Sequence, residues 1–389
     1  MKLKDIDTKK FEYFCSCAAA WMGILLLGVL FLYGLFYTQE HISNEHSVFQ
    51  TVRTAAPLML AYTALAAAAA HFAAKLLLGK KEHQERNLRI LLASVCVYVG
   101  VLGFAWAALC SYQMDWDAQM LSFYGEQFAS GLREFDAYDI DYITAYPHQL
   151  GMIALAELLY RLFGAGNYRA FQALNALGTS GIVFAGYQIV RELTDRKEPA
   201  AYFLLLMPFC WPVMIYVAFF YGEILSILFS LLSVYALLVY LRRKRKRDIL
   251  YMALAVTLAC LIRINCYILL IAMGCVLVVK AVSGKKLCHL LALSSCVLCC
   301  LLAHFALVKI YEQRTDLDLE HGMPAVVYLA MGSREGMDGR EAGWYNLAYS
   351  WDLFVRQAGK NQEQAKELAG EVIEESVEIF REDPAYMLD

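Results

Sequence analysis

Two aspartates, Asp115 and Asp117, flank Trp116 in a polar interval between long apolar blocks of the chain. They stand two positions apart just beyond the end of an apolar segment, so both side chains can face one pocket. A carboxylate in such a place can act as a general base on a hydroxyl or an amine, and a pair can share a divalent cation such as Mg²⁺ or Mn²⁺. Beyond that cation, the sequence points to no cofactor. The alternative is a solvated loop pair, because so short a motif recurs by accident.

The polar interval, residues 111–151, closes with Tyr146-Pro147-His148-Gln149. Carboxylates at the mouth of a membrane bundle are costly to place, so they indicate a functional site. The many aromatic residues of the interval are typical of a segment on the membrane surface, either beside a lipid-borne substrate or simply as an interfacial belt. We take Tyr146 and His148 as candidate substrate-binding residues. His148 would neutralise a phosphate, although a lone histidine is more often structural and can cap a short helix.

Two further polar turns interrupt apolar runs, one at Arg263 and Asn265 and the other at Glu223. A guanidinium at the membrane surface can hold a lipid phosphate through two hydrogen bonds. The alternative is an arginine that only extends toward the headgroups. The second turn can present its carboxylate to the same pocket. We therefore expect these three residues to bind substrate.

The composition indicates a membrane protein. Of 389 residues, 60% are hydrophobic and 18% are charged. Soluble domains contain roughly 45–50% apolar and about 25% charged residues. The net charge of -3 implies no basic surface and therefore no nucleic-acid partner. Most of the 12 cysteines lie in apolar runs and lack zinc-site spacing, so they predict no metal site.

Apolar segments of roughly 17–25 residues can cross a bilayer as helices. The segments that qualify lie at about 14–37, 55–78, 89–110, 168–190, 199–220, 223–241, 248–264, 265–281 and 287–310. The segment 147–163 is shorter and carries Glu157. We therefore predict an all-α polytopic bundle with about nine transmembrane helices. Pro208 and Pro212 should kink the fifth span.

Lysine and arginine mark the cytoplasmic side of a membrane protein. The N-terminal lysines and the basic run 242–247 fall on one side only if 147–163 lies along the outer interface as a juxtamembrane helix, or dips into the membrane and returns. We therefore expect a multi-pass protein of the plasma membrane, embedded in the lipid bilayer, with a cytoplasmic N-terminus formed by an uncleaved signal anchor. The basic run is interpreted as an orientation signal.

The chain divides into a membrane domain, 1–310, and a polar extracytoplasmic tail, 311–389. The membrane domain contains the candidate catalytic outer loop, 111–147. In the tail, the apolar pattern predicts a helix from about 361 to 382. The sequence stops at Asp389 without a closing element, from which we expect a fragment of a longer protein.

The order of these features resembles the GT-C superfamily of polyprenyl-phosphate-dependent glycosyltransferases. The chain has a first long outer loop with an aspartate pair, then the short segment YPHQLGMIALAELLYRLFG, then a spanning helix. It looks most like bacterial relatives of the protein O-mannosyltransferase and lipid A aminoarabinose transferase group. LIRINCYILLIA (261–272) and MGSREGMDGREAGWYN (331–346) are also similar to segments of that group. Two features differ: the acidic pair is Asp-Trp-Asp instead of Asp-Glu, and two additional crossings precede the loop.

The resemblance implies an acidic residue in the first outer loop as catalytic base or metal ligand, which falls on Asp117 or Asp115. It also implies a sugar donor linked to polyprenyl phosphate, with Arg263 as the candidate that holds the phosphate. The acceptor would be an extracytoplasmic glycan, protein or lipid. We therefore expect a membrane glycosyltransferase.

Two other classes of protein stay open. A polytopic transporter or lipid flippase would gather its ionisable groups at mid-bilayer within inverted repeats. A non-enzymatic envelope-assembly protein would not need the aspartate pair.

Overall fold

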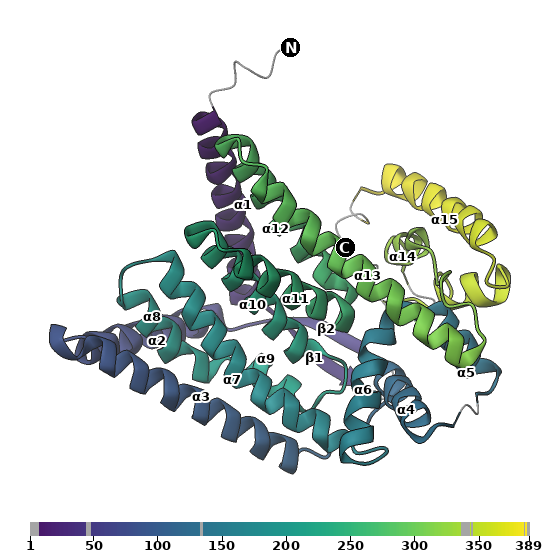
Figure 1. The fold of residues 1–389 in the computed structure, drawn as a ribbon, viewed down its shortest axis with the longest axis horizontal. Helices are drawn as coiled ribbons and strands as arrows, with labels where there is room; N and C mark the ends of the chain where they lie inside the picture. The colour runs from purple at the N-terminus through teal and green to yellow at the C-terminus, as the bar shows by residue number, and fades with distance from the viewer. Residues whose placement is uncertain are drawn as a thin grey trace.

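The computed structural model describes residues 8–43, 48–132, 135–335, 343, 345–384 and 386. Within these ranges regular structure is helical apart from one β-hairpin, which confirms the expected all-α membrane class (Figure 1). The bundle consists of α1 (Thr8–Phe36), α2 (Ala56–Leu77), α3 (Gln84–Leu109), α7 (Tyr168–Leu193), α8 (Glu198–Leu206), α9 (Trp211–Ile215), α10 (Glu223–Arg243), α11 (Lys246–Ile262), α12 (Tyr267–Gly284) and α13 (Cys288–Thr315). The other helices are α4 (Trp116–Ser130), α5 (Ala137–Ala145), α6 (Leu150–Phe163), α14 (Ala325–Gly332) and α15 (Gln362–Glu382). Shorter turns are η1 (Lys81–His83), η2 (Pro147–Gln149), η3 (Met207–Phe209), η4 (Tyr216–Ala218), η5 (Ile264–Cys266) and the π-helical η6 (Asp352–Gln357).

Seven helices in the described ranges are long and apolar enough to cross a membrane, namely α1, α2, α3, α7, α10, α12 and α13. An eighth span results if the broken pair within 198–218, bent by 52°, counts as one. Pro208 and Pro212 lie at this break, as expected for residues that cannot donate a backbone hydrogen bond. The remaining predicted span, 248–264, corresponds to α11. Its 17 residues rise only about 26 Å, less than a hydrocarbon core of about 30 Å.

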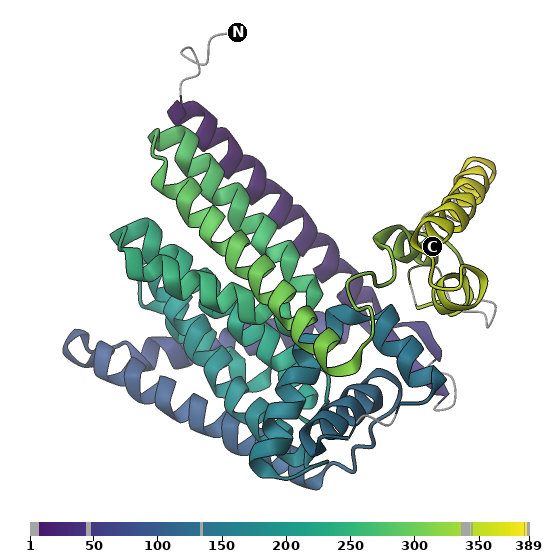
Figure 2. The ribbon, with the colours of Figure 1, turned by 45° about the vertical axis from the view of Figure 1, so that its right-hand side comes forward.

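The long helices pack in the order α3, α7, α10, α11, α13 and α12, and α1 packs against α12 (Figures 1 and 2). In the middle, α10 and α11 form a helical hairpin that begins at Glu223, turns after Arg243 and ends at Ile262. Helix α6 contacts α4, α7, α11 and α13. Helix α6 and the α10–α11 hairpin, which are far apart in the sequence, therefore meet at the end of the bundle at which the hairpin begins and ends.

A β-hairpin between α1 and α2 was not predicted. Its strands, β1 (Tyr37–Ser43) and β2 (Val48–Arg53), pair antiparallel, with Tyr37 opposite Arg53. The β-branched and aromatic residues of β2 favour a strand. In a hydropathy pattern, however, a short strand pair is masked by the two long apolar segments beside it.

The short segment 147–163 forms η2 and α6, as expected for a helix too short to span. One face of α6 is buried, and Gly151 lies so close to α11 that an added Cβ would be 1.9 Å from the Leu261 carbonyl oxygen. Only glycine permits this approach. It brings the N-terminus of α6 next to the turn at Arg263.

The predicted helix at 361–382 is confirmed as α15, which packs on α14 beside the bundle (Figure 2). The polar tail does not stand apart from the membrane domain. The backbone N–H of Met323 donates to the Ala145 carbonyl at 2.9 Å, and Lys360 Nζ lies 2.5 Å from Asp141 Oδ1. Most of the Gly-rich segment 331–346 lies outside the described residues.

Glu157 anchors α6 to the end of α13. Its side chain is 7% exposed, and Arg314 donates to both carboxylate oxygens at 2.8 Å. Arg161 lies 2.7 Å from Oε1, and the Tyr311 hydroxyl donates to Oε2 at 2.5 Å. Burial alone would raise the pKa of Glu157, but the hydrogen bonds from Arg314 and Tyr311 and the charges of Arg314 and Arg161 bring it below its ordinary value. The buried carboxylate is therefore ionised and fully paired.

Substituting Glu157 with Gln should lower the free energy of unfolding by about 3–5 kcal/mol, because two guanidiniums lose their buried counter-ion. The folded-state pKa of Glu157 lies below the ordinary value of 4.5. The wild type should therefore lose this stabilisation as the pH falls from about 4.5 through the folded-state pKa, whereas the variant should not. Unfolding in detergent at several pH values measures both effects, with the exposed Glu378→Gln as control. An equal acid-dependent loss in wild type and Glu157→Gln would contradict this account.

Candidate functional site

A cavity of about 880 Å³ opens where η2, the start of α6, the turn after α11, α13 and the C-terminal segment meet. A volume of this size can bury most of a small ligand. Its polar lining includes His148, Gln149, Tyr221, Arg263, Asn265, Tyr267, His304, Glu320, His321, Tyr328 and Gln362. Met152, Ile262 and Ile268 are among the apolar residues of its wall. The cavity can therefore accommodate a ligand with both a charged and an apolar part.

Asp117 lies one hydrogen bond behind this wall. The Tyr142 hydroxyl donates to Oδ1 at 2.7 Å, and the Tyr221 hydroxyl donates to Oδ2 at 2.7 Å. Gln149 lies between the tyrosines, with Oε1 3.2 Å from the Tyr142 hydroxyl and Nε2 donating to Tyr221 at 3.3 Å. Burial, reinforced by the Asp117 carboxylate, raises the pKa of both tyrosines, so both keep their protons. Each carboxylate oxygen retains a second lone pair for another donor.

Tyr221 also holds Arg263. The guanidinium carbon lies 4.5 Å from the centre of the Tyr221 ring, and Nη1 donates to the Tyr221 carbonyl at 3.3 Å. The same Nη1 lies 2.9 Å from Glu223 Oε1. Gly222 makes the turn possible, because its φ is +89° and a Cβ there would lie 2.6 Å from Ile262. Asp117 and Arg263, from distant parts of the chain, therefore meet on one tyrosine.

His148 lines the cavity as a neutral imidazole. Burial lowers its pKa to about 4, although the Asp117 carboxylate acts in the opposite direction. At neutral pH it can donate a hydrogen bond to a phosphate, but it carries no charge with which to neutralise one. Tyr146 is buried behind it, edge-on to the imidazole at 5.9 Å and stacked on Trp351 at 6.0 Å between ring centres. Tyr146 therefore supports His148 and the wall.

The two aspartates have different surroundings. Trp116, between them, has a φ of 44°, in the left-handed region that a bulky residue rarely adopts. After this turn Asp117 accepts hydrogen bonds from the two tyrosines, whereas Asp115 is exposed at the N-terminus of α4. Neither aspartate is part of the cavity lining. Across the described ranges, no three His, Cys, Asp or Glu side chains are arranged to hold a metal ion. A shared cation at Asp115 and Asp117 stays a prediction, and no chemical step below depends on it.

The other candidate residues divide between the cavity and its support. Asn265 is exposed and lines the cavity. Glu223 is half-buried and not in the lining. Its Oε1 pairs with Arg263, and its Oε2 has no hydrogen-bond partner among the described residues. Glu223 therefore positions the guanidinium.

Sequence reasoning missed the roles of Tyr142, Tyr221 and Gln149 as the links between Asp117 and the cavity. Their spacing carries no motif, so only the fold reveals them. It also missed His304, which lies within α13 and lines the cavity. An ionisable residue inside an apolar span often marks a functional site, so the position of His304 in the sequence could have identified it.

Residues 148–308 match the model of the family described as dolichyl-phosphate-mannose-protein mannosyltransferase. Comparisons with curated proteins and with solved structures found no significant match. The matched region includes His148, Tyr221 and Arg263, but Asp117 precedes it. Together with the apolar helices, the match indicates a multi-pass membrane glycosyltransferase of the GT-C kind. Over residues 148–308, this chain is similar to the dolichyl-phosphate-mannose-protein mannosyltransferases.

Proposed function

We propose that this protein transfers a sugar from a polyprenyl-phosphate carrier to a hydroxyl or amine of an extracytoplasmic glycan, protein or lipid, with Asp117 as the base. The observation that supports it is Tyr221, which donates to Asp117 while its ring stacks on Arg263. One residue thus joins a group that can accept a proton to a group that can stabilise a phosphate.

In the proposed reaction, the acceptor donates a hydrogen bond to a free lone pair of Asp117. As its oxygen or nitrogen bonds to the anomeric carbon, the proton passes to Asp117. The bond between that carbon and the phosphate oxygen breaks, and its electron pair stays on the phosphate. The leaving polyprenyl phosphate gains one negative charge, which Arg263 stabilises and to which His148 donates a hydrogen bond.

An apolar groove beside this site supports the proposal of a donor with a long hydrocarbon chain. The groove, of about 430 Å³, runs between α6, α7, α10 and α11, and Ile262 lines both the groove and the cavity. Leu155, Leu158, Leu225 and Leu261 are among its other walls. A donor with its phosphate at Arg263 would extend its chain into this groove.

This proposal agrees with the membrane orientation that the sequence predicts. The cavity would face the extracytoplasmic side of the plasma membrane, and the basic run 242–247 would face the cytoplasm. The polar tail, which contributes Tyr328 and Gln362 to the lining, would then cover the cavity from outside.

Replacing Asp117 with Asn should reduce transfer from a radiolabelled undecaprenyl-phosphate hexose in proteoliposomes by about 10²–10⁴-fold, because an amide cannot take the acceptor's proton. Asp115→Asn is the matched control, and it should cost at most about tenfold because Asp115 is exposed. Undiminished transfer by Asp117→Asn would remove this residue from the mechanism. Equal large losses in both variants would favour a shared cation, and movement of intact donor without transfer would favour a transporter or flippase.

Replacing Arg263 with Gln should lower kcat by about 10²–10³-fold, because the leaving phosphate loses its cation. Arg263→Lys should restore only part of this, since an ammonium does not reproduce the planar stacked geometry. Glu223→Gln tests the alternative that Arg263 serves only as the counter-ion of Glu223. It should leave donor binding intact or tighter because the guanidinium loses a competing carboxylate. Equal loss of folded protein in Arg263→Gln and Glu223→Gln would instead assign the pair a structural role.

A further inference from the structure

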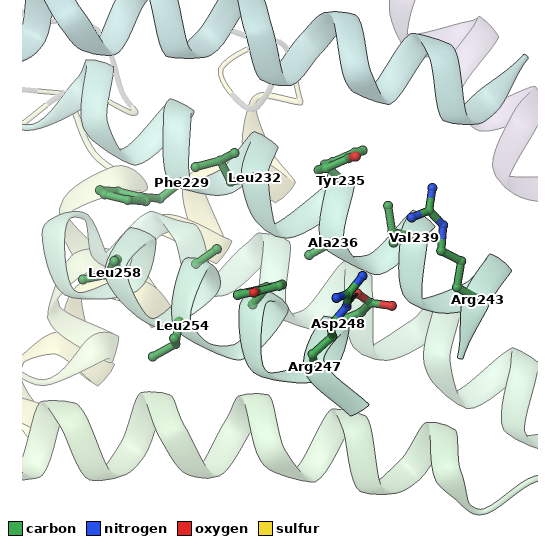
Figure 3. Close-up of a pocket in the computed structure, with 12 residues that line it drawn as sticks. Phe229, Leu232, Tyr235, Ala236, Val239, Arg243, Arg247, Asp248, Leu254 and Leu258 are labelled. Atoms are coloured by element: carbon green, nitrogen blue, oxygen red, sulfur yellow. Dashed lines mark ion pairs between the residues drawn. The ribbon is translucent and has the colours of Figure 1, made fainter. Parts of the chain in front are cut away.

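A second cavity, of about 470 Å³, lies between α10 and α11 (Figure 3). Its charged residues lie where the hairpin turns, at the opposite end from Arg263. Figure 3 shows Arg243, Arg247 and Asp248 together at one end of this cavity, and Phe229 and Leu258 at the other. The wall between Arg247 and Leu258 follows about 16 Å of helix α11. The cavity is therefore an elongated apolar groove with a charged end.

The charged end contains a buried acceptor without a donor. Asp248 is 4% exposed, and its Oδ2 has no hydrogen-bond partner among the described residues. The nearest cation, Arg247, places Nε 3.8 Å from Oδ1, which leaves Oδ2 unsatisfied. A buried carboxylate oxygen without a donor is costly, so a ligand that supplies a hydroxyl proton would be favoured here.

The guanidiniums at this end are available to an anion. The Arg243 side chain is 45% exposed, and its Nη2 lies 3.6 Å from Glu192 Oε1. Arg242 lies closer to Glu192, with Nη1 at 3.1 Å from Oε2. Arg247 is 60% exposed. With Asp248, the two arginines leave one net positive charge in the cavity, which matches a single phosphodiester. The rest of the basic run, Arg242 and residues 244–246, adds long-range attraction for anionic lipid.

The apolar wall opens to the outside of the bundle. Tyr251, Leu254 and Leu258, which line it, are 59%, 50% and 42% exposed. A free phosphate ion would leave these surfaces without a partner, whereas a hydrocarbon chain would cover them. Phe229 and Leu258 also line the groove next to Ile262, so the chain in this cavity would end where the groove proposed for the donor begins.

We propose that this cavity binds one anionic, hydroxyl-bearing phospholipid of the phosphatidylglycerol type. Its phosphodiester lies between Arg243 and Arg247, a headgroup hydroxyl donates to Asp248 Oδ2, and one acyl chain follows α11 toward Leu258. This gives part of the basic run a ligand, in addition to its role as an orientation signal.

Native mass spectrometry of the full chain in detergent, titrated with phosphatidylglycerol or phosphatidylcholine, tests this proposal. Phosphatidylcholine has the same phosphodiester but neither a net negative charge nor a hydroxyl donor. The wild type should prefer phosphatidylglycerol, and Arg243→Gln/Arg247→Gln should weaken its binding by about thirtyfold. Leu254→Trp, a change on the exposed wall, should reduce binding of both lipids by filling the groove.

The matched control is Arg245→Gln/Lys246→Gln, which removes two charges of the same run that do not line the cavity. It should retain the preference. Equal weakening by both double variants would show diffuse attraction and overturn the proposal, as would equal binding of the two lipids by the wild type. Displacement of phosphatidylglycerol by undecaprenyl phosphate that depends on Arg243 and Arg247 would instead assign the cavity to the donor.

Discussion

The hydrogen bonds from Tyr142 and Tyr221 to Asp117 require three separate segments of the chain to meet. Asp117 lies in the first turn of α4, Tyr142 lies in α5, and Tyr221 lies in the turn before α10. A carboxylate near a membrane is tolerated when donors compensate for the water that it loses. The contact between Gly151 and α11 and the buried Glu157 pairs hold α6 against the bundle. The site therefore depends on tertiary packing that lies outside the cavity itself.

The helical hairpin of α10 and α11 carries different chemistry at its two ends. At one end Glu223 and Arg263 form an ion pair beside Asp117, and at the other Arg243, Arg247 and Asp248 form the charged end of an apolar groove. Two adjoining grooves, which share Phe229 and Leu258, run along the hairpin between these ends. Such an arrangement suits lipids, because each has a charged headgroup at one end of a long hydrocarbon chain.

The family match covers only one part of the candidate site. His148, Gln149, Tyr221 and Arg263 fall within residues 148–308, whereas Asp117 and Tyr142 precede this region. In the proposed mechanism, the matched part would hold the donor phosphate. The part that precedes it would activate the acceptor.

The sequence by itself determined the helical class, the short helix at 147–163, the break at Pro208 and Pro212 and the helix at 361–382, since each follows from local hydropathy, length or proline chemistry. It also located the turn at Arg263, because a polar pair between two apolar runs must lie near a membrane surface. Only the tertiary structure decided that Tyr221 joins Asp117 to Arg263, that Glu223 pairs with the guanidinium, and that Asp115 is exposed. Those relations depend on which side chains meet across 104 residues of chain, for Tyr221 and Asp117, or 40 residues, for Arg263 and Glu223, and on the backbone turn at Trp116. Neither the contacts nor the turn can be deduced from the spacing of residues along one sequence.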